Sequence, residues 1–325
     1  MNLVEGLASR GHEVTLYATG DSQAPARVRS VFPTAAWPPN TYREIVHAAA
    51  AAYDVLSRDG IDVIHAHVAS LLAFARILDV PIVYTVHHDR DEALCDLYRA
   101  THGYPITMVA ISARQRDLIS DICEARVVHH GVSPSLYPLG PGNGGYVAFL
   151  GRFAPEKGVH VAIDVARRAR LPIRLAGKSH DDRYFGAEVG PRLRDPLVRW
   201  VGEVSHAPKV RLLGDAVATL FPINWEEPFG LVMIESMLCG TPVLSFPRGS
   251  APEVIDEGIT GWLVDSEVQM AEKLVHLASG KERFDRARCR RFAARRFSAD
   301  RMVDEYLAVY NEALGIPHHV PQVDR

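Results

Sequence analysis

Strand-like and helix-like segments alternate along the 325 residues of this chain. The expected strands are short aliphatic or β-branched runs, at residues 13–18, 62–65, 82–87, 108–111 and 126–129, and then at 146–150, 173–176, 198–201, 218–221 and 243–246. Such alternation is typical of parallel sheets that helices cover on both faces. It predicts an α/β fold with ligands bound at the carboxyl ends of the strands.

The length of the chain and one linker-like segment indicate two domains. A chain of 325 residues is too long for one ordinary core. Residues 131–145 are rich in Gly, Pro and Ser, which favours a linker. We therefore expect two Rossmann-like, doubly wound domains at residues 1–138 and 139–297, followed by a capped C-terminal helix and a tail at 298–325.

The start of the chain departs from a doubly wound pattern. The first expected element is a helix at residues 3–10, which Gly11 ends, whereas such a domain should begin with a strand. We expect the first domain to lack its first strand, either because Met1 is an internal methionine or because the chain is shortened. The strands at 13–18 and 62–65 would then carry unpaired backbone groups, and the first domain would be less stable than the second.

Composition excludes several classes of protein. The formal net charge of −3 argues against a general nucleic-acid binder. The four cysteines have no paired spacing, which favours a reducing compartment and no thiolate metal site. No apolar run approaches the ~20 residues of a membrane span, and Glu5 interrupts any signal-peptide core. These features predict a cytoplasmic protein.

The segment Asn224–Gly240 contains two carboxylates, Glu227 and Glu235, around a Pro-Phe-Gly turn and an apolar, helix-forming run. Proline is tolerated in the first turn of a helix, so Glu227 is expected in a loop and Glu235 within the helix. A helix N-terminus carries partial positive charge and favours phosphate. The segment thus predicts a phosphate site beside a carboxylate that can bind sugar hydroxyls.

A second motif, Gly151–Gly158, follows an expected strand and precedes a helix. Arg152 and Lys157 bracket its short turn, so both side chains can face the end of the strand. Arginine offers a planar fork of donors and lysine a point charge, and together such cations can stabilise a diphosphate group that leaves during a reaction. A pyridoxal Schiff base on Lys157, as in glycogen phosphorylases, fits this turn less well.

Together these motifs resemble the family-4 retaining glycosyltransferases of the GT-B fold, over residues of about 1 to 312. The resemblance implies that Glu227 contacts the donor sugar, that Glu235 holds the ribose, and that Arg152 and Lys157 bind the diphosphate. It implies contacts of the following turn with sugar hydroxyls and phosphate, through Phe229, Gly230, Leu231 and Val232. It also implies that Gly202, Glu203 and Val204 lie near the base, and that the last helix crosses back to the first domain. A looser similarity points to the avilamycin-type antibiotic-pathway subgroup.

Histidines occur at the expected strand ends of the first domain, at positions 65, 67, 87, 88, 129 and 130. A zinc site lacks a recognisable set of four ligands. Thr85-Val86-His87 resembles the Thr-x-His segment of the family, which implies that His87 contacts the donor sugar near the reaction centre. His67 is a candidate for acceptor contact, although a structural role explains it as well.

Three further segments have structural explanations. Asp89-Arg90-Asp91 has the form of a DxD metal motif but opens a helix, where acidic residues are favoured anyway. The turn at residues 249–253 suits a helix cap. Seven arginines at residues 283–296 indicate a solvated helix face, with peripheral contact to an anionic membrane surface as an alternative.

The resemblance implies a metal-independent, retaining glycosyltransferase with no cofactor, which moves a sugar from a nucleotide diphosphate sugar, most simply a UDP-sugar, to an acceptor hydroxyl. The acceptor would be a saccharide, a lipid or a small molecule. Two alternatives stay open. One is a nucleotide-sugar epimerase or hydrolase on the same fold, and the other is a non-catalytic nucleotide-sugar-binding protein.

Overall fold

The computed structural model describes residues 2–36 and 40–317. Met1, whose status as the true start the sequence leaves open, lies outside the described residues. The chain divides into two compact units. The first comprises Met1–Gly131 and Ala299–Arg325, and the second comprises Val132–Ser298.

The second unit is built on a six-stranded parallel sheet in the order β12-β11-β10-β7-β8-β9. Its strands are β7 (Val147–Leu150), β8 (Ile173–Ala176), β9 (Val198–Trp200), β10 (Thr219–Phe221), β11 (Val243–Ser245) and β12 (Gly261–Leu263). After β7 the chain adds β8 and β9 on one side of the sheet, and after β10 it adds β11 and β12 on the other side. The order therefore reverses between β7 and β10, which makes this the switch point at which doubly wound sheets bind ligands.

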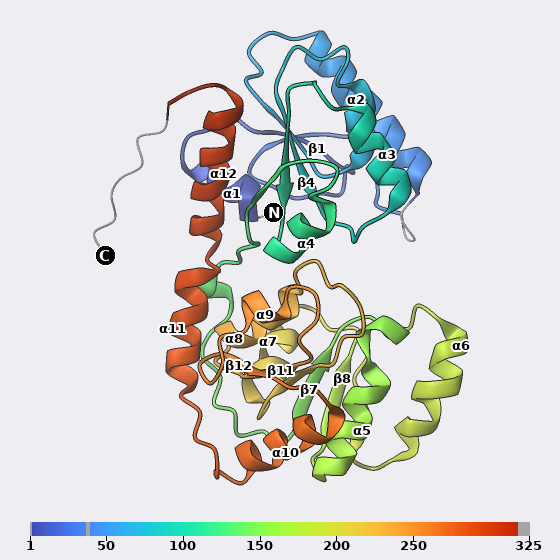
Figure 1. Ribbon diagram of the computed structural model, residues 1–325, viewed down its shortest axis with the longest axis vertical. Coiled ribbons are helices and arrows are strands. Elements are labelled where there is room, and N and C mark those ends of the chain that lie inside the picture. Colours follow the sequence, from blue (N-terminus) through green and yellow to red (C-terminus); the bar gives the residue numbers. More distant parts are fainter. Residues whose placement is uncertain (1, 37–39, 318–325) are drawn as a thin grey trace. The chain divides into compact units, whose positions relative to one another are not determined.

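Helices cover both faces of this sheet (Figure 1). They are α5 (Val159–Ala169), α6 (Asp182–Tyr184), α7 (His206–Asp215), α8 (Leu231–Leu238), α9 (Ala251–Val254), α10 (Glu267–Ala278) and α11 (Arg286–Arg296), with short turns η2 (Pro134–Leu136), η3 (Pro155–Lys157), η4 (Phe185–Val189) and η5 (Gly190–Arg194). Helices α5 and α10 pack together against the strands. Their apolar faces, including Ile163 and Leu274, form one buried cluster with Leu175 and Leu220. Burial of these side chains on both sides explains why the strands lack an alternating polar face.

The first unit contains two separate parallel sheets. Strands β3 (Ile64–Ala66), β4 (Ile82–Val86), β5 (Ile106–Ala110) and β6 (Ala125–Val127) pair in chain order. Strands β1 (Thr15–Tyr17) and β2 (Arg27–Arg29) pair only with each other. The accompanying helices are α1 (Asn2–Ser9), α2 (Thr41–Leu56), η1 (Ala69–Phe74), α3 (Glu92–Ala100) and α4 (Ala113–Ile119). Because β3 pairs with β4 alone, it forms an edge of its sheet.

The last helix, α12 (Ala299–Ala313), belongs to the first unit and lies beside α1 (Figure 1). Its buried residues include Tyr306 and Tyr310, which form a cluster with Val83 and Val109 of the sheet. The Tyr306 hydroxyl lies 2.9 Å from Thr85 Oγ1 in the centre of β4. The C-terminal helix therefore completes the core of the first unit.

The sequence predicted ten strands, and the described part of the chain has two more, β2 and β12. Strand β2 is Arg-Val-Arg and β12 is Gly-Trp-Leu, so neither has the aliphatic run that marks the others. Both are three-residue edge strands whose conformation comes from pairing with a neighbour. Pairing partners of this kind cannot be identified from a local pattern.

The interpretation of the arginine-rich segment as a solvated face is wrong for part of α11. Arg286 donates to the carbonyl oxygens of Gly140, Ala216 and Gly214 at 3.0, 3.1 and 2.7 Å. Arg290 binds the carbonyl oxygen of Pro134 at 2.8 Å and also that of Leu238 at the end of α8. Cations satisfy the carbonyls at helix C-termini. Arg296 is half-buried and binds the carbonyl oxygen of Glu253. The other four arginines, at positions 283, 288, 291 and 295, are exposed, and their contact with an anionic membrane surface stays a prediction.

Candidate active site

Two loops leave the sheet of the second unit on either side of its switch point. The loop after β7 carries Arg152 and Lys157, and the loop after β10 carries Glu227. A backbone hydrogen bond of 2.8 Å from Asn224 N to Glu156 O joins them. Gly158 has a φ of +68°, and a Cβ there would collide with the carbonyl oxygen of Pro222. The glycine in the second motif therefore lets the two loops approach closely.

Lys157 and Glu227 form an ion pair between these loops. The side chain of Glu227 is 10% exposed and that of Lys157 is 15% exposed. Trp225 Nε1 donates to Glu227 Oε2, the oxygen that Lys157 also contacts, at 2.9 Å. Lys157 Nζ lies 4.6 Å from the centre of the Trp225 ring. The sequence motif includes Trp225 but gave it no role. In the structure it fixes the carboxylate and the ammonium together.

The turn after Glu227 leads into α8, and Gly230 is its N-cap residue with a φ of +76°. A Cβ at Gly230 would lie 2.9 Å from the ring of Phe221, so the position requires glycine. The first N–H groups of the helix, at Leu231 and Val232, have no acceptor within the helix. Phe229 packs its buried ring on Phe297. The expected helix N-terminus is therefore present, but the helix begins at Leu231, so Pro228 lies in the turn before the helix and not in its first turn.

Glu235 lies on α8, within the helix as predicted, but it has its own partners. Tyr137 donates its hydroxyl hydrogen to Glu235 Oε1 at 2.7 Å, and Lys209 Nζ donates to the same oxygen at 2.6 Å. Burial, followed by the hydrogen bond with Glu235, raises the pKa of Tyr137, which keeps that hydroxyl a donor. Sequence reasoning missed Lys209 and Tyr137. The first is on α7 and the second in the linker-like segment, and neither belongs to a motif.

The turn at residues 249–253 contacts the backbone of Glu227. Ser250 N donates to Glu227 O at 3.0 Å, and Ser250 Oγ donates to Phe229 O at 2.7 Å. Gly249 has a φ of +53°, and a Cβ there would lie 2.5 Å from Glu227 O. The turn does begin helix α9, as expected, but it also positions the loop that carries Glu227.

Arg152 and the segment Gly202–Val204 lie less enclosed. The Arg152 side chain is 49% exposed and has Glu156 at 3.7 Å. Glu203 and Val204 line a cavity of about 470 Å³ with Arg174 and Arg211, and the guanidinium of Arg174 lies 3.7 Å from the ring centre of Tyr146. The structure describes no direct contact of Arg152 or Glu203 with Glu227 or Glu235.

The first unit gathers four imidazoles at the carboxyl ends of its strands, which we call the histidine cluster: His65, His67, His87 and His130. His67 Nδ1 lies 2.8 Å from His87 Nε2, and His87 stacks on His130 with ring centres 5.6 Å apart. His65 instead binds the Tyr310 hydroxyl at 2.6 Å and Thr85 Oγ1 at 2.8 Å, which gives it a structural role. The sequence placed His67 and His87 at neighbouring strand ends, and the structure brings them into contact.

Desolvation sets the protonation of this cluster. Desolvation, together with the charges of neighbouring histidines, lowers the pKa of His67 and of His87 to about 4 and that of His130 to about 3. His67 remains exposed, whereas His87 and His130 are half-buried. At neutral pH the imidazoles are therefore uncharged, and each can donate one hydrogen bond and accept one.

Across residues 2–36 and 40–317, no three His, Cys, Asp or Glu side chains are arranged to hold a metal ion. Asp91 of the DxD-like segment is the N-cap of α3, where its side chain accepts from Leu94 N at 3.0 Å. Arg90 pairs with Glu92 and Asp121. The capping interpretation of this segment is confirmed.

Within the described part of the chain, no helix combines the length and the apolar character that crossing a membrane requires.

Two family models match nearly the whole chain. The model described as "Glycosyltransferase Family 4" matches residues 1–136, and "Glycosyl transferases group 1" matches residues 139–296. Among curated relatives, glycogen synthase of Mycobacterium tuberculosis is 27% identical, with 62% of this chain and 55% of the relative covered. D-inositol 3-phosphate glycosyltransferase of Mycobacterium leprae is 30% identical, with 62% and 53% covered. The chain thus spans about half the length of these curated relatives.

Solved structures with the same fold are similar over almost all of this chain. AviGT4, a glycosyltransferase involved in avilamycin A biosynthesis, has a TM-score of 0.74 at 23% identity and covers 97% of this chain and 88% of its own. HepE of Anabaena, in complex with UDP and glucose, has a TM-score of 0.76 at 17% identity, with 96% and 94% covered. Sucrose-phosphate synthase of Thermosynechococcus elongatus has a TM-score of 0.80 at 18% identity, with 96% and 92% covered. The matched models, with this shared fold of two Rossmann-like domains, show that the chain belongs to the family-4 glycosyltransferases of the GT-B type.

Proposed function

We propose that this chain transfers a sugar from a nucleotide diphosphate sugar to a hydroxyl group of an acceptor, with retention of anomeric configuration and without a metal ion. The observation that carries the proposal is the pairing of Lys157 with Glu227 at the switch point of the second sheet. A cation for phosphate and a carboxylate for sugar hydroxyls thereby occupy the place where such sheets bind ligands.

In this proposal the departing diphosphate is stabilised by charge. Lys157 has three N–H donors, so it can bind a diphosphate oxygen while it remains paired with Glu227. Arg152 is half exposed and free to turn toward a ligand, and the N-terminus of α8 adds partial positive charge. Fixed cations and dipoles of this kind lower the barrier by electrostatic stabilisation. They supply positive charge that a metal ion would otherwise provide.

Glu227 and His87 would orient the reacting sugar, and Glu235 would hold the ribose. Lys209 and Tyr137 keep the Glu235 carboxylate in one position before the donor arrives. We assign the base to the cavity beside Glu203 and Val204. The UDP bound to HepE, together with the shared fold, favours a UDP-sugar as the donor.

Retention follows if the acceptor hydroxyl attacks from the face that the phosphate leaves, and a phosphate oxygen takes its proton. No acid is needed on the leaving group, in contrast to the carboxylate pair of glycosidases. His67 touches His87 and is our candidate for acceptor contact.

The test is acceptor-dependent release of nucleoside diphosphate by the full chain, with a panel of UDP-, GDP- and ADP-sugars and of sugar, polyol and lipid acceptors. Proton NMR of the product reports anomeric configuration, and a chelator tests the need for a metal. Lys157→Met should lower kcat/KM at least 100-fold, whereas Arg168→Met, an exposed change on α5, should leave it within twofold. Equal release with and without acceptor would identify a hydrolase instead. Donor binding without any turnover would identify a binding protein.

A further inference from the structure

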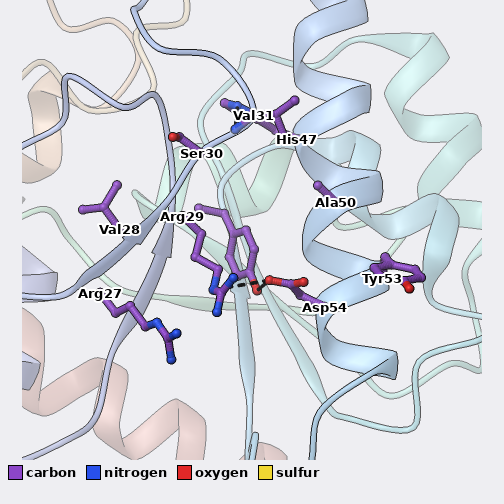
Figure 2. Close-up of a pocket in the computed structure, with 10 residues that line it drawn as sticks. Arg27, Val28, Arg29, Ser30, Val31, His47, Ala50, Tyr53 and Asp54 are labelled. Atoms are coloured by element: carbon purple, nitrogen blue, oxygen red, sulfur yellow. Dashed lines mark hydrogen bonds and ion pairs between the residues drawn. The ribbon is translucent and has the colours of Figure 1, made fainter.

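A pocket in the first unit has no role in the proposed transfer. It is a cavity of about 500 Å³ between β2 and α2 (Figure 2). Tyr17 and Arg29, which line it, are the last residues of β1 and β2, and Ser30 follows Arg29 directly. The pocket is therefore open to the carboxyl ends of parallel strands, where ligand sites are generally built.

The charges around this pocket are predominantly positive. Of the residues that line it, Arg27 and Arg29 are cations and Asp54 of α2 is the acid. A further guanidinium, that of Arg58, lies 3.6 Å from Asp54 Oδ2. Two guanidiniums, those of Arg29 and Arg58, thus lie beside one carboxylate, and with Arg27 the formal charge at the pocket is about +2. His47 adds no charge at neutral pH, because burial and then the charge of Arg43 lower its pKa.

The single carboxylate does not satisfy these donors. Asp54 Oδ2 already accepts the hydroxyl hydrogen of Tyr17 at 2.8 Å. Arg29 Nε lies 3.4 Å from the same oxygen, is buried, and makes no hydrogen bond to any described residue. Figure 2 shows Arg29 and Asp54 directed toward each other across the pocket. Buried donors are normally hydrogen-bonded, whereas this nitrogen has only the long ion pair with an oxygen that Tyr17 already occupies, so it requires an explanation.

We propose that the pocket binds a small phosphate ester, with the phosphate held by Arg27 and Arg29. A phosphate monoester carries about −1.5 to −2 charge at neutral pH. This charge matches the excess of about +2 at the pocket better than the single negative charge of a carboxylate ligand would. The planar fork of arginine binds such oxyanions through two parallel N–H groups. Arg27 has no described side-chain partner and is exposed at the pocket, so it can engage a ligand without breaking an existing ion pair. The hydroxyl group of Ser30 would bind the organic part. The inference does not depend on the proposed function.

The experiment titrates inorganic phosphate into the full chain by calorimetry. Because Arg152 and Lys157, the diphosphate ligands of the proposed function, would also attract phosphate, the parent protein for this test carries Arg152→Gln and Lys157→Gln. Arg27→Gln and Arg29→Gln should each weaken phosphate binding at least tenfold. Arg116→Gln, an exposed residue of α4 paired with Asp117, is the matched control and should leave the affinity unchanged.

Circular dichroism verifies that each variant is folded. If Arg29→Gln does not fold, Arg27→Gln still tests the proposal. Acetate, which carries one charge, should bind at least tenfold more weakly than phosphate. The proposal is overturned if the parent protein does not bind phosphate, if acetate binds as tightly, or if both pocket variants bind phosphate like the parent.

Discussion

Replacing Gly249 with alanine tests whether the turn before α9 positions the loop that carries Glu227. The added Cβ would lie 2.5 Å from Glu227 O and 2.9 Å from Glu227 Cα. Ordinary contacts of a Cβ begin at 3.4 Å, so the backbone of Glu227 or of the turn must move by about 1 Å to relieve the overlap. The change therefore displaces the carboxylate without removing it.

Two effects contribute to the expected magnitude. Gly249 has a φ of +53°, and a left-handed conformation costs an L-residue roughly 1–2 kcal/mol. Overpacking against a buried backbone adds roughly 1–3 kcal/mol. Gly280 has a φ of +72° with no atom within 4 Å of its added Cβ, so Gly280→Ala shows the conformational cost alone. We expect a loss of about 2–5 kcal/mol for Gly249→Ala and about 1–2 kcal/mol for the control.

Urea unfolding followed by tryptophan emission reports mainly on the second unit, because three of the four tryptophans, Trp200, Trp225 and Trp262, lie there. A displacement of about 1 Å at a reacting centre can cost about 100-fold in rate. We therefore expect kcat/KM of Gly249→Ala to fall 10- to 100-fold, and that of Gly280→Ala to change less than twofold. The reasoning is refuted if the two variants lose equal stability and both keep their activity.

Three further predictions follow from the geometry. Glu235→Ala should mainly raise the KM for the donor, because a ribose contact persists from ground state to transition state, whereas Glu227→Ala should mainly lower kcat. If steady-state kinetics show the kcat effect for Glu235→Ala and the KM effect for Glu227→Ala, the two roles must be exchanged. The pKa values of the histidine cluster in the folded chain lie below the unfolded value of about 6.5. Between pH 6.5 and about 4 the unfolded chain therefore binds more protons than the folded chain. The stability of the first unit is thus full above pH 6.5 and declines as the pH falls. Hydrogen exchange should show that decline, His130→Gln should reduce it, and a first unit equally stable at pH 7 and pH 4.5 would contradict this. Arg286→Met should destabilise the second unit by about 3 kcal/mol, since it leaves buried carbonyl groups without donors, whereas the exposed Arg288→Met should change the unfolding free energy by less than 0.5 kcal/mol.

The sequence alone determined the class of fold and the location of the candidate site. Short β-branched runs between helices require a parallel sheet that is buried on both faces. Glycine and proline at fixed places after two of those runs predicted the turns that carry Lys157 and Glu227. These are local properties, because strand propensity, turn conformation and helix starts depend on residues close together in the chain.

The tertiary structure decided which side chains meet. Glu235 is 26 residues from Lys209 and 98 from Tyr137, and no spacing rule relates them. Strand β2 exists because Arg27–Arg29 pairs with β1. Arg286 is half-buried because the linker-like segment and the end of α8 bring carbonyl groups to it. Such contacts depend on how elements far apart in the sequence pack together, and a local sequence pattern does not show that packing. The partners that hold the candidate site in place were therefore visible only once its residues had been located in three dimensions.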